Sequence, residues 1–202
     1  MQGFFVQLPP CGIAKPSLLA VRSLCIILNF SFSQTTPMSK LETSKTSGIH
    51  LQLSKLAGNW AGTSKVWFEP GDPVDTAEVT GTMKLIMNGK YILHEYKSAF
   101  QGKPLEGIAI YAYNLDLNKY EMAWIDSFHT GTFIMFSEGK RNTDEFKMLG
   151  SYAYVTPETE QHWGWRTEIN MTSDDDVVIT AYNISPEGEE SKATEFVYKR
   201  QA

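Results

Sequence analysis

Residues 78–100 read EVTGTMKLIM–NG–KYILHEYKSAF, two extended runs joined by Asn88-Gly89. Asn-Gly is the strongest short signal for a two-residue hairpin turn, because both residues tolerate positive φ. In the first run, Val, Gly, Met and Leu alternate with Thr and Lys. This period of two is typical of a strand with one buried face, so the stretch predicts an antiparallel β-hairpin.

Similar runs follow one another from Gly58 to Arg200, with almost no helical periodicity between them. Each run ends in turn-forming residues and the loops are short, so consecutive runs are expected to pair as antiparallel neighbours. Closing such a sheet on itself removes its edges. The pattern therefore predicts an all-β, up-and-down barrel of about ten strands. The predicted strands are 60–68, 78–87, 90–100, 107–114, 120–128, 132–138, 145–155, 162–171, 177–184 and 192–200.

The first 37 residues differ from the rest of the chain. They combine Lys15 and Arg22 with a short apolar run at 24–28 and contain no acidic residue, which is the layout of a secretory signal. The alternative is an over-extended reading frame ahead of a true start at Met38. The first reading predicts a periplasmic or secreted protein and the second a cytoplasmic one. The apolar run is too short for a stable membrane span.

Two further segments complete the predicted organisation. Residues 38–49 are polar and low in complexity, which favours a flexible lead. The barrel domain is expected over residues 50–202. It opens with leucines spaced as in one short helical turn, which we expect to plug one end of the barrel before the first strand.

Composition limits the classes of function. The chain has 202 residues, 42% of them hydrophobic, and a net charge of -5, which argues against nucleic acid as a partner. Both cysteines, Cys11 and Cys25, precede the barrel, so cysteine nucleophiles and cysteine-ligated metals are excluded from it. The four histidines show no zinc spacing, and we expect no metal and no cofactor. Haem stays open, since it needs only one axial histidine.

The segment Gly58-Asn59-Trp60 resembles the Gly-x-Trp signature of lipocalins and the wider calycin group. In that group a basic residue near the chain end covers the tryptophan, and Arg200 is the candidate here. Residues 60–71, 107–114 and 124–127 resemble an uncharacterised bacterial family, DUF1579. The resemblance covers most of the chain after residue 50. It implies a calycin-like barrel and no activity, because that family has no assigned catalytic residues.

Asp126 and His129 lie three residues apart at the end of a predicted strand. A carboxylate and an imidazole at this spacing can act as a general base pair or as two metal ligands. The competing interpretation is that the Asp126 side chain caps the turn over residues 127–131 by hydrogen bonding to the turn backbone. The sequence favours the turn cap.

Glu95 is a third catalytic candidate. Its neighbour His94 must point to the opposite face of the strand, so only one of the two can line the lumen. A lumenal Glu95 would need a partner such as Arg166, and the alternative is that Glu95 faces solvent.

The expected function is the binding of a small apolar or aromatic ligand inside the barrel. Trp163 and Trp165 share a face and can stack on a flat molecule, although core packing is the commoner role of such residues. The alternatives are an enzyme that acts on a small molecule, and a filled barrel that acts through a partner or a second subunit. Strands that are apolar on both faces fit such a homo-oligomer. The residues expected to contact a ligand are Met83, Tyr111, Trp124, Trp165 and Arg166.

Overall fold

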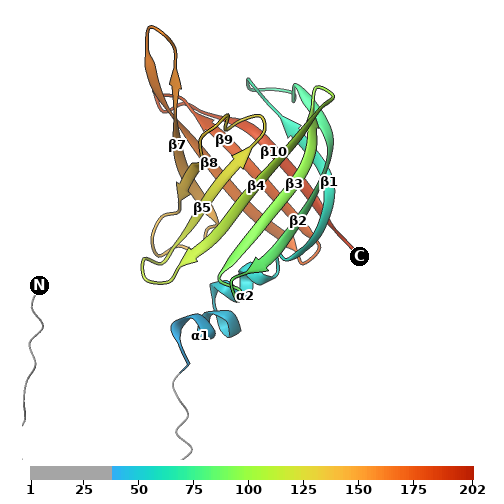
Figure 1. Ribbon diagram of the computed structural model, residues 1–202, viewed down its shortest axis with the longest axis vertical. Helices are drawn as coiled ribbons and strands as arrows, with labels where there is room; N and C mark the ends of the chain where they lie inside the picture. Colours follow the sequence, from blue (N-terminus) through green and yellow to red (C-terminus); the bar gives the residue numbers. More distant parts are fainter. Residues whose placement is uncertain (1–37) are drawn as a thin grey trace, which may run out of the picture. The chain divides into compact units, whose positions relative to one another are not determined.

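The computed structural model describes residues 38–202, and the predicted signal or over-extended start lies outside this range. Ten antiparallel strands form one closed barrel in the order β1-β10-β9-β8-β7-β6-β5-β4-β3-β2 (Figure 1). The prediction of an all-β, ten-stranded up-and-down barrel is confirmed. The strands are β1 Gly58–Val66, β2 Asp75–Ile86, β3 Tyr91–Phe100, β4 Lys103–Asn114, β5 Lys119–Asp126, β6 Met135–Glu138, β7 Lys147–Val155, β8 Glu160–Ser173, β9 Asp176–Ile184 and β10 Glu190–Gln201.

Two strand boundaries differ clearly from the predictions. β4 begins four residues early, because Gln101 and Gly102 form a tight turn with positive φ that lets Phe100 pair directly with Lys103. β6 spans only four residues, and most of the stretch between Asp126 and Met135 is a loop.

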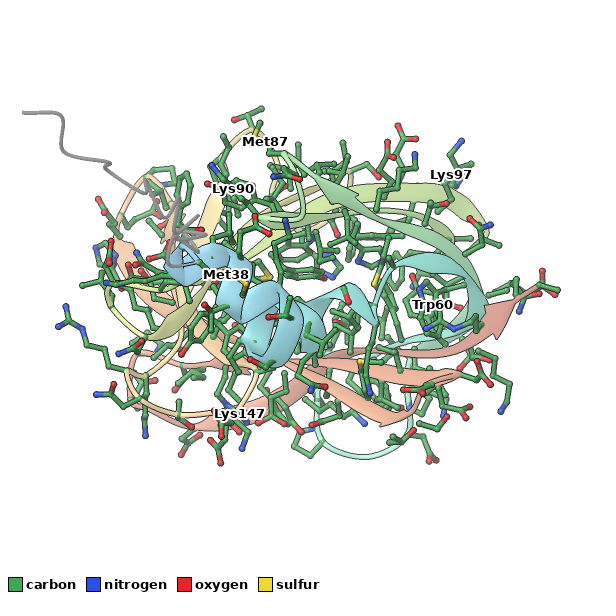
Figure 2. The ribbon with its side chains drawn as sticks, turned by 90° about the horizontal axis from the view of Figure 1, so that it is seen from below. Met38, Trp60, Met87, Lys90, Lys97 and Lys147 are labelled. Atoms are coloured by element: carbon green, nitrogen blue, oxygen red, sulfur yellow. The ribbon has the colours of Figure 1, made fainter. Side chains whose placement is uncertain are left out.

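Two short helices, α1 Lys40–Ser47 and α2 Ile49–Ser54, precede the barrel. A helical turn was expected here, but the lead at 38–49 was expected to be flexible. The structure differs because Ser39 caps α1 by accepting a hydrogen bond from the Glu42 N–H, and Glu42 pairs with Lys45 one turn later. Seen from this end, the helices lie across the barrel opening (Figure 2). No helix within residues 38–202 is long and apolar enough to cross a membrane.

The first and last strands meet at Trp60 and Arg200, which are paired in register. The Trp60 side chain is 1% exposed and its indole N–H donates to the carbonyl of Leu56 at 2.9 Å. The guanidinium of Arg200 lies 4.3 Å from the indole centroid, so the predicted contact is confirmed. The same guanidinium donates to the carbonyls of Lys55, Ala57 and Asp174, each at 2.7 Å. Arg200 therefore joins the helical plug, the first strand and the β8–β9 turn.

We predict that Trp60→Ala lowers the free energy of unfolding by about 3–5 kcal/mol, the usual range for truncating a large buried side chain. Arg200→Ala is expected to cost less. The double variant should show a coupling of roughly 0.5–2 kcal/mol, because the two side chains touch. Urea unfolding of the three variants measures this. Lys199→Ala, at an exposed neighbouring position, is the control. Zero coupling would remove the energetic role of the contact.

Candidate ligand site at the distal end of the lumen

The lumen is largely filled by side chains. The cavity that remains has a volume of about 40 Å³. That is room for a water molecule, well below the ~300 Å³ of a typical small-molecule pocket. The cavity lies toward the distal end of the barrel, the end opposite α1 and α2. Its walls are formed by His94, Tyr96, Ala109, Tyr111, Met122, Trp124, Asp126, His129, Trp165, Thr167, Ile179, Ala181, Thr194 and Phe196.

Asp126 ends β5 with its side chain buried, and its two oxygens serve different groups. Oδ1 accepts hydrogen bonds from the backbone N–H groups of Phe128, His129 and Thr130, which confirms the predicted turn cap. Oδ2 lies 2.6 Å from Nδ1 of His129 and 3.3 Å from the hydroxyl of Tyr96. The carboxylate therefore holds the turn with one oxygen and faces the lumen with the other. The turn cap and the Asp–His pair, alternatives at the sequence level, are both present.

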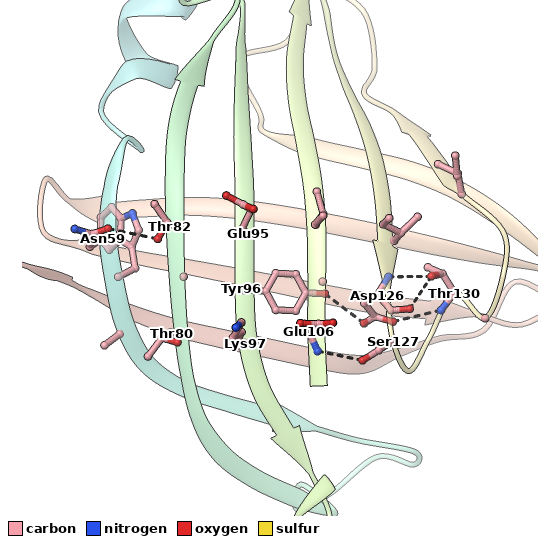
Figure 3. Close-up of a pocket in the computed structure, with 18 of the residues that line it drawn as sticks. Asn59, Thr80, Thr82, Glu95, Tyr96, Lys97, Glu106, Asp126, Ser127 and Thr130 are labelled. Atoms are coloured by element: carbon pink, nitrogen blue, oxygen red, sulfur yellow. Dashed lines mark hydrogen bonds between the residues drawn. The ribbon is translucent and has the colours of Figure 1, made fainter. Parts of the chain in front are cut away.

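The hydrogen bonds continue inward from Asp126. Tyr96 donates to the carboxylate and accepts from the indole N–H of Trp124 at 2.9 Å (Figure 3 shows the Tyr96–Asp126 contact). Burial raises the pKa of Tyr96, and the charge of Asp126 raises it further. Burial works against ionisation of Asp126, but the hydrogen bond from His129, the positive charge of His129 when it is protonated, and the turn backbone together outweigh it, so the pKa of this carboxyl is lowered. The site therefore holds a carboxylate next to a neutral phenol.

The aromatic rings of Trp124, Trp165 and His129 pack together beside this network. Trp124 and Trp165 stack with centroids 5.3 Å apart, and the His129 ring lies 5.5 and 5.6 Å from them. The indole N–H groups of Trp60, Trp67, Trp124 and Trp163 all donate to oxygens, whereas that of Trp165 has no partner within residues 38–202. Nε2 of His129 likewise lacks a partner there. Trp165 and His129, each with a ring nitrogen that has no protein partner in this range, therefore line the same cavity.

His94 lies deeper in the lumen and is fully satisfied. Its Nδ1 lies 3.1 Å from the hydroxyl of Tyr111, and its Nε2 lies 3.2 Å from the hydroxyl of Tyr198. Burial lowers the pKa of His94 to about 3 and raises the pKa values of both tyrosines. The three groups are neutral near pH 7 and form a hydrogen-bonded layer of the core.

The structure places the candidate residues Glu95, Arg166 and Met83 away from the lumenal cavity. Glu95 lies on the outer wall and pairs with Lys84 at 3.0 Å, so its solvent-facing alternative is the correct one. Arg166 also lies on the outer wall, where it pairs with Glu168 and Glu190, and its expected place beside a lumenal ligand is corrected. The reason is strand alternation: Trp165 and Thr167 point inward, so Arg166 points out. Met83 is buried deeper in the lumen, away from the cavity.

Two contributors were missed from the sequence. The sequence assigns no role to Tyr96, because both faces of its strand mix polar and apolar residues. Thr130, whose hydroxyl accepts from the Asp126 N–H at 2.9 Å, lies in a loop with no periodic signal. The alternation of His94 and Tyr96 against Glu95 was the usable clue, since it puts the two rings together on one face.

A larger but half-open groove lies on the outer wall over β1–β5 and beside the 130–134 loop (Figure 3). Its volume is about 1000 Å³. Its lining is more apolar than polar and includes the exposed Ile108, Ile125 and Ile134, together with the buried Asp126 and Thr130 of the turn. We place the candidate site in the smaller lumenal cavity, because the stacked tryptophans and His129 line that cavity and not the groove. Within residues 38–202 no group of three or more His, Cys, Asp or Glu side chains is placed to hold a metal ion.

The fold and the lumen define a closed, ten-stranded antiparallel β-barrel protein with a polar aromatic cluster at one end. The chain belongs to the family described as "Protein of unknown function (DUF1579)", whose model matches residues 45–200. Among solved structures, the barrel is similar to the crystal structure of Rv2717c from M. tuberculosis. That match has 14% identity and a TM-score of 0.49, and it covers 76% of this chain and 98% of the other. No curated protein matches the chain.

The buried His94 predicts a specific pH dependence of stability. Its pKa falls from 6.5 to about 3 on folding, so the unfolded chain binds the proton more strongly, and stability is lost as the pH falls below 6.5. The wild type should lose about 2 kcal/mol from this group between pH 7 and pH 5. His94→Gln should abolish that part of the loss. Urea unfolding at both pH values tests this, with His162→Gln, at an exposed histidine, as the control. Equal losses in wild type and His94→Gln would contradict it.

Proposed function

We propose that the barrel binds a small planar aromatic molecule that carries an O–H or N–H donor, at the distal end of its lumen. The observation that carries this proposal is the free acceptor of His129 and the free donor of Trp165 beside the stacked pair of tryptophans. Buried or half-buried polar groups normally find partners, and a few convergent polar groups among aromatic walls are typical of small-molecule sites.

The hydrogen bond between Asp126 and His129 also determines whether a ligand must donate or accept a hydrogen bond. An ionised carboxylate only accepts hydrogen bonds, so Asp126 Oδ2 requires a proton on Nδ1 of His129 whenever the imidazole is neutral. Nε2 then carries a lone pair and accepts. A phenol or an azole N–H satisfies it, whereas a methyl group does not.

The negative charge of Asp126 disfavours ligands that carry a carboxylate, such as fatty acids. Asp126 is buried, and its nearest positive charge would be a protonated His129. A ligand carboxylate at Nε2 would meet an acceptor and lie near a second carboxylate, which is repulsive. We therefore favour neutral aromatic donors over fatty acids or aromatic acids.

The present cavity is too small for such a ring, so binding requires a side chain to move. The best candidate is Phe128, because it lies on the loop of residues 127–134, is 42% exposed and packs on His129, which stays hydrogen-bonded to Asp126. Rotation of side chains at a binding site is common and leaves the backbone nearly unchanged. Aliphatic and aromatic groups deeper in the lumen are buried on all sides and have no such freedom.

We predict that phenol binds more tightly than toluene or benzoate. One neutral hydrogen bond contributes about 0.5–1.5 kcal/mol, which corresponds to roughly a two- to tenfold preference for phenol over toluene. Quenching of tryptophan fluorescence, checked by native mass spectrometry, measures the three affinities. His129→Asn should erase the preference, because the Asn amide can still donate to Asp126 but has no group at the Nε2 position. His162→Asn is the matched control. Equal binding of phenol and toluene to the wild type would refute the proposal.

A second prediction concerns Asp126→Asn. The new amide can donate to Nδ1 of His129 and thereby shift the proton of the ring to Nε2, which turns the acceptor into a donor. The preference should then invert toward acceptors such as benzaldehyde over phenol. The same fluorescence titration measures this, with ¹⁵N NMR of the imidazole to report the tautomer. An unchanged preference in a variant whose tautomer has shifted would show that Nε2 does not contact the ligand.

A further inference from the structure

The wall of the barrel is incomplete between β6 and β7. These strands share only two residue pairs, Ser137 with Gly150 and Glu138 with Leu149. On its other side, β7 pairs with β8 along its whole length, from Lys147 to Val155. The five residues Ser151–Val155 therefore have a strand partner on one side only. We call this segment the free edge.

The neighbouring loop does not replace the missing strand. Residues 127–134 occupy the space beside the free edge, but the hydrogen bond of Phe133 stays within the loop, from its N–H to the carbonyl of Thr130. The contact between them is a stacking of Phe133 on Tyr152, with centroids 6.5 Å apart. Within residues 38–202 the backbone N–H and C=O groups on this side of the free edge thus have no hydrogen-bond partner, which is the usual template for pairing with another strand.

The side chains around the free edge are apolar and exposed. Tyr154 and Val155 are 56% and 66% exposed, and Phe136, across the gap in the wall, is 67% exposed. Leu149 and Ile134 are also largely exposed. Leu149 and Val155 lie on one face of β7 and Tyr154 on the other, so exposed apolar side chains flank the unpaired backbone on both faces, which marks an interaction surface.

We propose that a second copy of this chain covers the free edge, by antiparallel pairing of the two β7 strands across a two-fold axis at Ala153. In this register Ser151 pairs with Val155 of the second copy, and Tyr152 pairs with Tyr154, so aromatic side chains meet across the strands. Each copy satisfies the unpaired backbone of the other in one contact, which is the self-complementarity that a two-fold interface requires.

The distribution of charged residues supports a second copy of the chain as the partner of the free edge. No charged residue occurs between Lys147 and Glu158, so nothing in the paired stretch opposes a like charge. The flanking charges have opposite sign, and antiparallel pairing brings Lys147 of one copy to the same end as Glu158 of the other. The approach is also open: Figure 1 shows the hairpin of β7 and β8 extending beyond the rest of the distal rim.

The test is the oligomeric state of the full chain by sedimentation equilibrium, from roughly 1 to 100 μM, a range that covers micromolar dimers. We expect a dimer that dissociates on dilution. Ala153→Lys places two like charges at the axis and puts lysine on the edge, so it should weaken the dimer at least about tenfold. The matched control is Thr80→Lys, on the outer face of β2, where strands pair on both sides. It should leave the dimer intact.

Hydrogen exchange gives a second readout that does not depend on a variant. Edge amides among residues 151–155 should exchange rapidly in dilute wild-type protein and be protected at high concentration. A wild type that stays monomeric at 100 μM overturns the proposal. So does a dimer that survives Ala153→Lys in a folded protein, or one that is lost equally in Thr80→Lys. Ligand binding in the lumen is measured separately, so either proposal can fail alone.

Discussion

The structure depends on the pairing of the first strand with the last. Once β1 and β10 are in register, the sheet has no beginning or end there, and Arg200 is fixed over Trp60. The guanidinium then satisfies carbonyls of the helical plug and of the β8–β9 turn, groups that would otherwise lie unpaired near a closed barrel end. A single side chain of the last strand thus links the start of the domain to the β8–β9 turn, and it does so with charge-assisted hydrogen bonds, which are stronger than neutral ones.

A barrel closed in this way must satisfy the polar groups that it turns inward. The layer of His94 with Tyr111 and Tyr198 does so through two hydrogen bonds between neutral groups. Within residues 38–202 the hydroxyl of Ser137 is the one fully buried side-chain polar atom without a partner. At the distal end Asp126 is saturated, but Nε2 of His129 and the indole N–H of Trp165, which are not fully buried, have no protein partner in that range. These two open positions beside the stacked tryptophans, rather than cavity size, distinguish the candidate site from ordinary core.

The sequence was sufficient for the fold because the signals are local. Alternation and turn residues such as Asn88-Gly89 located all ten strands, and the Gly-x-Trp segment with Arg200 located the closure. It was insufficient where one residue serves two purposes. For Asp126 the sequence offers a turn cap and a partnership with His129 as alternatives, since a sequence does not show that two carboxylate oxygens can take separate roles. Arg166 was placed in the lumen for its chemistry, although alternation with Trp165 already put it outside. The helix at Lys40–Ser47 was missed because capping and a single ion pair outweigh its polar composition.

The loop of residues 127–134 connects the two surfaces argued above. Its first half carries His129 into the lumen, held there by the cap of Asp126. Its second half stacks Phe133 on Tyr152, one residue inside the free edge of β7. A loop stands here instead of a longer β6, because Asp126 holds the backbone of residues 128–130 in a turn, and residues in that turn do not pair with β7. The same turn therefore both presents His129 to the lumen and leaves the edge of β7 without a strand partner.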